Sequence, residues 1–184
     1  IVALGAHCTR IYPTLVIRGT ELEQRWKTGE YQPQRLEEAV ELTARLLEIF
    51  REGKVEVIRV GLHPSEGILD GSALLAGPFH TSFRELVETY IWKQKLVLLL
   101  SQHKAGSDIS IQATANELRY AIGYASANRL MLENHFNKVE FITMEEKEQD
   151  VPLILTDNRL PLPAKNSMKI IGNSIFLRKE GNVN

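Results

Sequence analysis

The chain has 184 residues, of which 43% are hydrophobic and 24% charged, and its formal net charge is -1. This composition is typical of a globular protein with one large domain or two small ones. The near-neutral charge excludes an overall basic field for nucleic acid, so any nucleic-acid surface would be a local patch. No apolar run approaches the roughly 20 residues that span a bilayer, and the first residues lack the basic start of a signal peptide. We therefore expect a cytoplasmic protein with no membrane segment.

The cysteine content limits the metal chemistry of the chain. Cys8 is the single cysteine. One thiol cannot form an internal disulfide, and an iron–sulfur cluster normally needs about three or four thiolates. The 5 histidines are scattered without a metal-binding spacing. We therefore predict no metal site in this chain, and we interpret Cys8 as a small, buried apolar residue at a strand edge.

The first element of the chain is an apolar, β-branched run over residues 11–17, which is interrupted only by Pro13. Apolar residues fall on both of its faces, which predicts a strand covered on both sides in a parallel sheet. A turn at Arg18-Gly19 follows it. Residues 21–31 are then expected to be a loop with one helical turn at most.

A helix and a returning strand complete this unit. The three- and four-residue spacing of apolar residues predicts a helix over residues 36–50, and the apolar run at residues 55–62 predicts a strand. This β-loop-α-β order is typical of parallel sheets and barrels. One such unit cannot close a barrel, and the chain begins at Ile1 directly before a strand that needs neighbours. We therefore expect a fragment of a longer protein.

Three segments of the sequence carry a family resemblance. They are RIYPTLVIRGTELEQRWKTGEY at residues 10–31, VIRVGLHPSE at residues 57–66 and AGPFHTSFRELVE at residues 76–88. Together they strongly resemble the radical S-adenosylmethionine proteins related to the elongator catalytic subunit, in the C-terminal part of those proteins only. The cluster-binding motif of the family, Cys-x-x-x-Cys-x-x-Cys, is absent from the chain.

The resemblance implies an α/β fold followed by an α+β fold. Residues 1–66 would be the last βαβ part of a partial (β/α) barrel. Residues 67–80 would be an irregular linker, and residues 81–184 an α+β C-terminal extension.

The resemblance also implies a cofactor in the full-length parent protein. There a 4Fe-4S cluster would cleave S-adenosylmethionine to a 5′-deoxyadenosyl radical that acts on a substrate, for which RNA is a candidate. In the resembled family the carboxyl edge of the second strand lies beside the adenosyl group, and this is also the edge at which ligands bind in open sheets and barrels. The residues predicted to bind the cofactor are Tyr12, Gly61, Leu62 and His63. The alternatives are core packing for Tyr12 and a loop hydrogen bond to nearby backbone for His63.

No catalytic residue is assigned within this chain. It has no phosphate-binding glycine loop and no nucleophile elbow. Because it also lacks the cysteines for the cluster, the chain alone is predicted to be inactive. The elongator catalytic subunit carries an acetyltransferase domain as well, but no acetyl-coenzyme A loop is present in this sequence, so acetyl transfer is not predicted.

The sequence of the second half of the chain predicts a mixture of helices and strands. Ser82 and Glu85 form a capping box that opens a second long helix. The elements predicted after it are a strand at 108–113, helices at 114–122 and 125–136, a strand at 138–143, a short strand at 153–155, and hairpin strands at 168–171 and 174–177 around a Gly172-Asn173 turn.

The β-α-turn-α-β order of residues 108–143 resembles the core of a KH-type nucleic-acid module. Such modules hold a single-stranded backbone with a Gly-x-x-Gly tetrad between two helices. Here Ser126 replaces the second glycine, and Tyr124 would crowd the phosphate approach. The candidates for RNA contact, with tRNA included among the RNA partners, are Lys104, Arg119, Gly123 and Arg129. The alternatives are a protein-binding module without catalytic activity and a purely structural extension.

Overall fold

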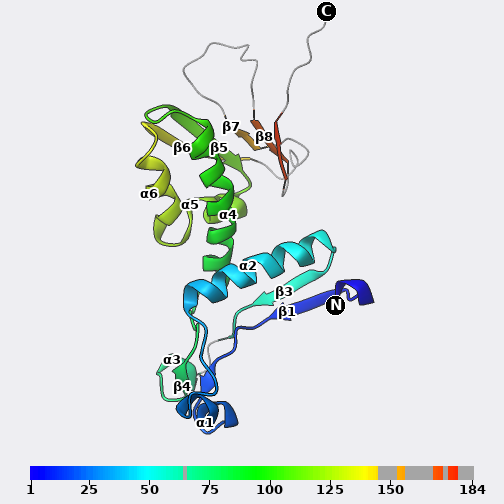
Figure 1. Cartoon of the computed structure of the whole chain (residues 1–184). Helices are drawn as coiled ribbons and strands as arrows, with labels where there is room; N and C mark the ends of the chain where they lie inside the picture. The colour runs from blue at the N-terminus through cyan, green and yellow to red at the C-terminus, as the bar shows by residue number, and fades with distance from the viewer. Residues whose placement is uncertain (64–65, 145–152, 156–167, 172–173, 178–184) are drawn as a thin grey trace, which may run out of the picture. The chain divides into compact units, whose positions relative to one another are not determined.

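The computed structural model describes residues 1–63, 66–144, 153–155, 168–171 and 174–177 (Figure 1). The chain divides into two compact units, Ile1–Tyr90 (the N-terminal unit) and Ile91–Asn184 (the C-terminal unit). The longest helix, α4 (Phe83–Gln102), runs across this division. The boundaries expected from the sequence at residues 66 and 81 stay a prediction.

The N-terminal unit contains the expected parallel strand pair. Strands β1 (Cys8–Ile11) and β3 (Glu56–Val60) pair in parallel. The chain between them includes α2 (Leu36–Glu52), which lies along the pair in Figure 1. The buried stripe of α2 follows helical spacing and consists of Ala39, Val40, Thr43, Ala44, Leu47 and Phe50. The predicted helix and returning strand are therefore confirmed, whereas a partial barrel stays a prediction because β1 and β3 form a sheet of two strands.

The single strand expected over residues 11–17 is wrong. Strand β1 ends at Ile11, and a separate strand, β2 (Val16–Ile17), begins five residues later. Pro13 explains the break, because it lacks the N–H that a ladder needs and restricts the residue before it. Strand β2 pairs instead with β4 (Leu74–Ala76) in the antiparallel sense.

Two segments expected to be irregular contain regular structure. Residues 21–27 form α1 (Glu21–Lys27), whose N-cap Thr20 accepts a hydrogen bond from the backbone N–H of Glu23. The expected linker at 67–80 includes β4 and most of a short helix, α3 (Glu66–Leu69). The linker is thus tied to the N-terminal unit through the β2/β4 pair.

The C-terminal unit shows the predicted order of elements. Its parts are strand β5 (Asp108–Ala113), helix α5 (Ala115–Ile122), the 3-10 turn η2 (Tyr124–Ser126), helix α6 (Ala127–Glu133) and strand β6 (Lys138–Thr143). Strands β5 and β6 pair in parallel without a register shift. The capping box at the start of α5 is formed by Thr114 and Glu117, whose side chains each accept a bond from the other residue's backbone N–H. The unit is compatible with an α+β fold, and its KH-like character stays a prediction.

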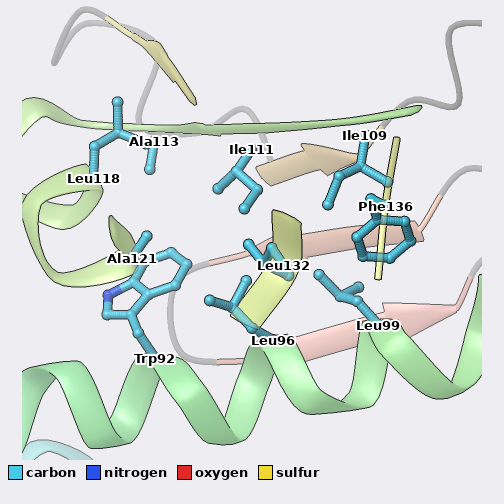
Figure 2. Packing of buried hydrophobic residues seen from close by; sticks show 10 residues of the cluster. All are labelled: Trp92, Leu96, Leu99, Ile109, Ile111, Ala113, Leu118, Ala121, Leu132 and Phe136. Carbon is cyan, nitrogen blue, oxygen red and sulfur yellow. The ribbon is translucent and has the colours of Figure 1, made fainter. Parts of the chain in front are cut away.

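An apolar core lies between α4 and the β5/β6 pair. Figure 2 shows Trp92, Leu96 and Leu99 projecting from α4 toward β5. The residues of this cluster are Trp92, Leu96, Leu99, Ile109, Ile111, Ala113, Leu118, Ala121, Leu132 and Phe136. Leu96, Ile111 and Leu132 are each 0% exposed. Burial of each such side chain stabilises the fold by roughly 1.5–3 kcal/mol, so this cluster stabilises the packing of α4 on the β5/β6 pair.

The last strands form a sheet of their own. Strands β7 (Leu153–Leu155), β8 (Met168–Ile171) and β9 (Ser174–Leu177) pair antiparallel in the order β7-β8-β9. The predicted hairpin strands are confirmed, and the Gly172-Asn173 turn lies outside the described residues. Within the parts of the chain given above, no helix has both the length and the apolar character to cross a membrane.

Candidate functional site

The carboxyl edge of the β1/β3 pair brings the predicted cofactor residues together. Tyr12 directly follows β1, and Gly61 directly follows β3. The backbone N–H of Gly61 donates a 2.9 Å hydrogen bond to the carbonyl of Ile11, which ties the two strand ends side by side. Tyr12 therefore lies next to the Gly61–His63 segment at one edge, as the sequence predicted for a ligand site.

The side chains at this edge differ in exposure. Tyr12 is 47% exposed, so it is not the core residue that the alternative required. Leu62 is half-buried and His63 is exposed. No hydrogen bond of the His63 ring occurs among the described residues, so the alternative loop bond is not seen there. The edge thus carries an aromatic ring, an aliphatic side chain and an imidazole that are each at least partly exposed.

Gly61 has a packing role in this structure. It is buried with a φ of +83°, and a Cβ atom added to it would lie 3.0 Å from Cβ and 3.2 Å from Cδ1 of Phe83. Glycine therefore allows the first turn of α4 to approach the end of β3. Contact of Gly61 with a ligand stays a prediction, since its Cα already faces Phe83.

The thiol of Cys8 does not occupy the buried position expected for it. Cys8 is free and exposed on β1. The expected burial of Cys8 is wrong because one face of β1 is uncovered. Cys8 and Arg10 are exposed on alternate positions of this strand. In the described ranges there is no group of three or more His, Cys, Asp or Glu residues that could hold a metal. The chain has one cysteine, so its own residues do not fit a 4Fe-4S cluster.

The sequence did not predict that the buried carboxylate of Glu23 and its partners hold α1 in place. Glu23 is only 6% exposed and accepts a 2.6 Å hydrogen bond from the backbone N–H of Gly19. Its carboxylate also lies 2.7 Å from Nζ of Lys27. The Lys27 ammonium and then the Gly19 N–H hold the pKa of Glu23 below its ordinary value of 4.5. The signal was present in the sequence, because Thr20 and Glu23 have the spacing of a helix start.

A second buried carboxylate joins α2 to α4. Glu88 is 3% exposed and lies 2.6 Å from Nη2 of Arg51 on α2. Nε of Arg84 lies 3.9 Å from the same carboxylate oxygen. These contacts compensate the burial of the charge and tie the first part of α4 to α2.

The four predicted RNA-contact residues lie at different parts of the C-terminal unit. Lys104 is exposed in the turn before β5, whereas Gly123 ends α5 with a φ of 86°. The Arg119 guanidinium lies 4.8 Å from the Tyr120 ring centroid, and the Arg129 guanidinium lies 5.0 Å from that of Phe141. These contacts with aromatic rings hold both guanidinium groups in place. The contacts of the described residues do not join Lys104 to the other three.

The turn between α5 and α6 departs from a Gly-x-x-Gly tetrad. Ala125 and Ser126 follow Gly123 with φ values of 50° and 60°, so two successive non-glycine residues adopt a left-handed conformation. Each costs of order 1 kcal/mol. Tyr124 is 43% exposed on this turn. The replaced glycine and the two left-handed residues weaken the analogy with a KH module.

The comparison with protein families matches the Radical SAM C-terminal domain over residues 6–93. Residues 6–93 are therefore similar to the C-terminal region of radical SAM proteins. The match contains β1, α2, β3 and the carboxyl edge of the β1/β3 pair, and it ends close to the division between the two units at Tyr90. The predicted RNA-contact residues all lie beyond residue 93, so the family match does not support them.

Several curated relatives match a short part of the chain. The chain is 64% identical over 33 residues to the "tRNA uridine(34) acetyltransferase" of Methanocaldococcus jannaschii, which covers 18% of this chain and 6% of that protein. It is 55% identical over 38 residues to the "Elongator complex protein 3" of Saccharomyces cerevisiae and 53% identical over 38 residues to that of Homo sapiens. In both cases the match covers 21% of this chain and 7% of the relative. The chain thus spans less than a tenth of the length of these relatives, and no solved structure matches it.

Proposed function

We propose that this chain is the C-terminal part of a radical SAM enzyme whose full-length form binds S-adenosylmethionine and a 4Fe-4S cluster and acts on a substrate, with RNA as the candidate. The observation that carries the proposal is the family match over residues 6–93. That match includes a parallel strand pair with exposed side chains at its carboxyl edge. The chain by itself is inactive in this proposal, because its single cysteine cannot hold the cluster.

The edge residues fit the adenosyl part of the cofactor. The half-exposed ring of Tyr12 and the side chain of Leu62 can pack on the adenine, and the exposed His63 can hydrogen bond to it. Gly61 would contribute through its backbone, since its Cα faces Phe83. When bound, the cofactor supplies the radical chemistry, and the residues of this chain orient it and exclude water. Residues 1–66 would form the end of the barrel, residues 67–80 the linker and residues 81–184 the extension.

The affinity for S-adenosylmethionine tests this assignment. We expect Tyr12→Ala and His63→Ala in the full-length protein to weaken equilibrium binding of the cofactor about tenfold. His7→Ala is the matched control, because His7 is an exposed histidine in front of β1, away from the carboxyl edge. Unchanged affinity in both edge variants, or equal loss in the control, would remove the cofactor assignment.

A second candidate function is an RNA- or protein-binding module in the C-terminal unit. Arg119 and Arg129, each held over an aromatic ring, favour it. The name of one relative also refers to tRNA, although acetyl transfer itself is not proposed for this chain. If the unit binds RNA through phosphates, its affinity for single-stranded RNA or tRNA falls with salt, and Lys104→Ala and Arg119→Ala each reduce the salt slope by about one. Absence of binding at low salt would exclude RNA and leave a protein partner or a structural role.

A further inference from the structure

Two arginines stand side by side on adjacent strands of the N-terminal unit. Arg10 of β1 and Arg59 of β3 are Cα partners in the parallel ladder, and both side chains are exposed. The register shifts between Thr9 and Arg10, so that Ile58 is passed over. This shift, which the sequence alone does not show, is what places the two arginines opposite each other.

Both arginines lie on the face of the strand pair that α2 does not cover. The partners on either side of them, Thr9 with Val57 and Ile11 with Val60, belong to the other face, where Ile11, Val57 and Val60 are buried. Because successive residues of a strand point to opposite faces, Arg10 and Arg59 share the open face. Tyr12, two residues after Arg10, is exposed at the edge of the same face.

Arg10 and Arg59 lack the partners that other arginines have. Among the arginines whose side chains the structure describes, eight contact a carboxylate, a carbonyl, a hydroxyl or an aromatic ring: Arg18, Arg25, Arg35, Arg45, Arg51, Arg84, Arg119 and Arg129. In the same part of the chain, neither Arg10 nor Arg59 has an ion pair or side-chain hydrogen bond. Glu56 lies on the same open face without an ion pair to either.

The chemistry of this pair selects its ligand. Arg10 and Arg59 are partner residues on neighbouring strands, which lie about 4.8 Å apart, so their like charges are close enough to repel each other, and an anion between them would relieve this repulsion. A guanidinium offers planar, paired donors that match the oxygens of phosphate. We propose that Arg10 and Arg59 together bind a phosphate group of a ligand on the open face of the β1/β3 pair.

This inference goes beyond the proposed cofactor. S-adenosylmethionine carries no phosphate, so the group bound by Arg10 and Arg59 belongs to a different molecule, next to the cofactor edge. The source is either a phosphate monoester, as in a nucleotide, or a phosphodiester of a nucleic-acid strand. Both sources share the chemistry that the two guanidinium groups recognise.

Binding of simple phosphate compounds to the 184-residue chain tests the proposal without cluster or cofactor, so its failure is distinct from failure of the proposed function. The probes are inorganic phosphate, adenosine 5′-monophosphate and a short oligoribonucleotide with hydroxyl groups at both ends, with adenosine as the uncharged control. We expect at least one phosphate probe to shift the arginine Nε–H signals in an NMR correlation spectrum, and Arg10→Gln or Arg59→Gln to weaken its binding about tenfold. A preference for the monophosphate identifies a monoester source, and a preference for the oligonucleotide identifies a phosphodiester source.

Matched variants separate a site from general surface charge. Arg45→Gln removes one exposed positive charge from α2, where Arg45 pairs with Glu41, and it should leave phosphate binding unchanged. Glu56→Gln removes the carboxylate of the open face and should strengthen binding by roughly threefold. Absence of binding by all three phosphate probes, or an equal loss in Arg45→Gln, would overturn the proposal.

Thermal stability gives a second readout. Phosphate that binds the folded chain raises its Tm. Arg59→Gln should abolish this rise while raising the Tm of the phosphate-free chain slightly, because the repulsion from Arg10 is relieved. A merely structural Arg59 would instead lower the Tm of the phosphate-free chain when it is replaced.

Discussion

Replacement of Gly61 by alanine is expected to destabilise the N-terminal unit through two separable effects. The φ of +83° is unfavourable for any residue with a Cβ, at about 1–2 kcal/mol. The new methyl group would also lie 3.0 Å from Cβ and 3.2 Å from Cδ1 of the buried Phe83. Such overpacking typically costs roughly 1–3 kcal/mol, so the total loss in the free energy of unfolding is about 2–5 kcal/mol.

A second glycine isolates the steric part. Gly29 has a φ of +80°, and a Cβ added there meets nothing within 4 Å. Gly29→Ala therefore carries the backbone cost alone, at about 1–2 kcal/mol. Urea unfolding followed by circular dichroism gives the free energy for both variants, and their difference is the contact with Phe83.

A double-mutant cycle identifies the contact itself. Shortening Phe83 to alanine removes Cγ and Cδ1 but keeps the Cβ atom, so it should relieve the ring part of the clash and make Gly61→Ala less destabilising by about 1 kcal/mol. Equal losses for Gly61→Ala and Gly29→Ala, together with no coupling to Phe83, would refute the packing role of Gly61.

Three further predictions concern buried groups. The pKa of Glu23 is lowered in the folded chain, so its carboxylate contributes stability above the ordinary pKa of 4.5, and this contribution is lost as pH falls through the folded-state pKa. Glu23→Gln should remove this part of the acid dependence of the Tm. Leu96→Ala at a 0% exposed site should cost about 2–5 kcal/mol in urea unfolding, whereas Val97→Ala at a 41% exposed site should change stability by less than about 0.5 kcal/mol. Glu88→Ala should cost about 3 kcal/mol by leaving Arg51 without its 2.6 Å partner, and no change in the urea midpoint would show that the pair contributes nothing net.

Much of the local structure follows from periodicity and caps in the sequence. The apolar spacing of residues 36–50 predicts α2, whose observed range is Leu36–Glu52. The Thr114 and Glu117 spacing predicts the start of α5, and both bonds of the capping box are present. These signals suffice because they depend on residues within one helical turn.

The features of the fold that the sequence did not predict depend on contacts between residues far apart in the chain. The apolar run at 11–17 gives no sign that its end, β2, pairs with residues 74–76 rather than continuing β1. The exposure of Cys8 and the pairing of Arg10 with Arg59 likewise depend on which face α2 covers and on the register shift in β1/β3. A pattern of period two fixes the face of a residue only when the register is known, and a shift of one residue reverses it.

The candidate cofactor edge was predictable to the level of the strand ends. Parallel strands place their carboxyl ends at one edge, so Tyr12 and the segment 61–63 were expected together and lie together. The close packing of Gly61 against Phe83 was not predictable, because it depends on the position of α4 relative to β3.

Formation of 5′-deoxyadenosine from S-adenosylmethionine tests the central claim most directly. The native polypeptide that carries this chain would be purified without oxygen and incubated with the cofactor and a strong reductant. We predict that 5′-deoxyadenosine accumulates with the wild type, and that Tyr12→Ala and His63→Ala reduce it while His7→Ala does not. Absence of 5′-deoxyadenosine from a wild-type preparation that holds an intact cluster would contradict the account.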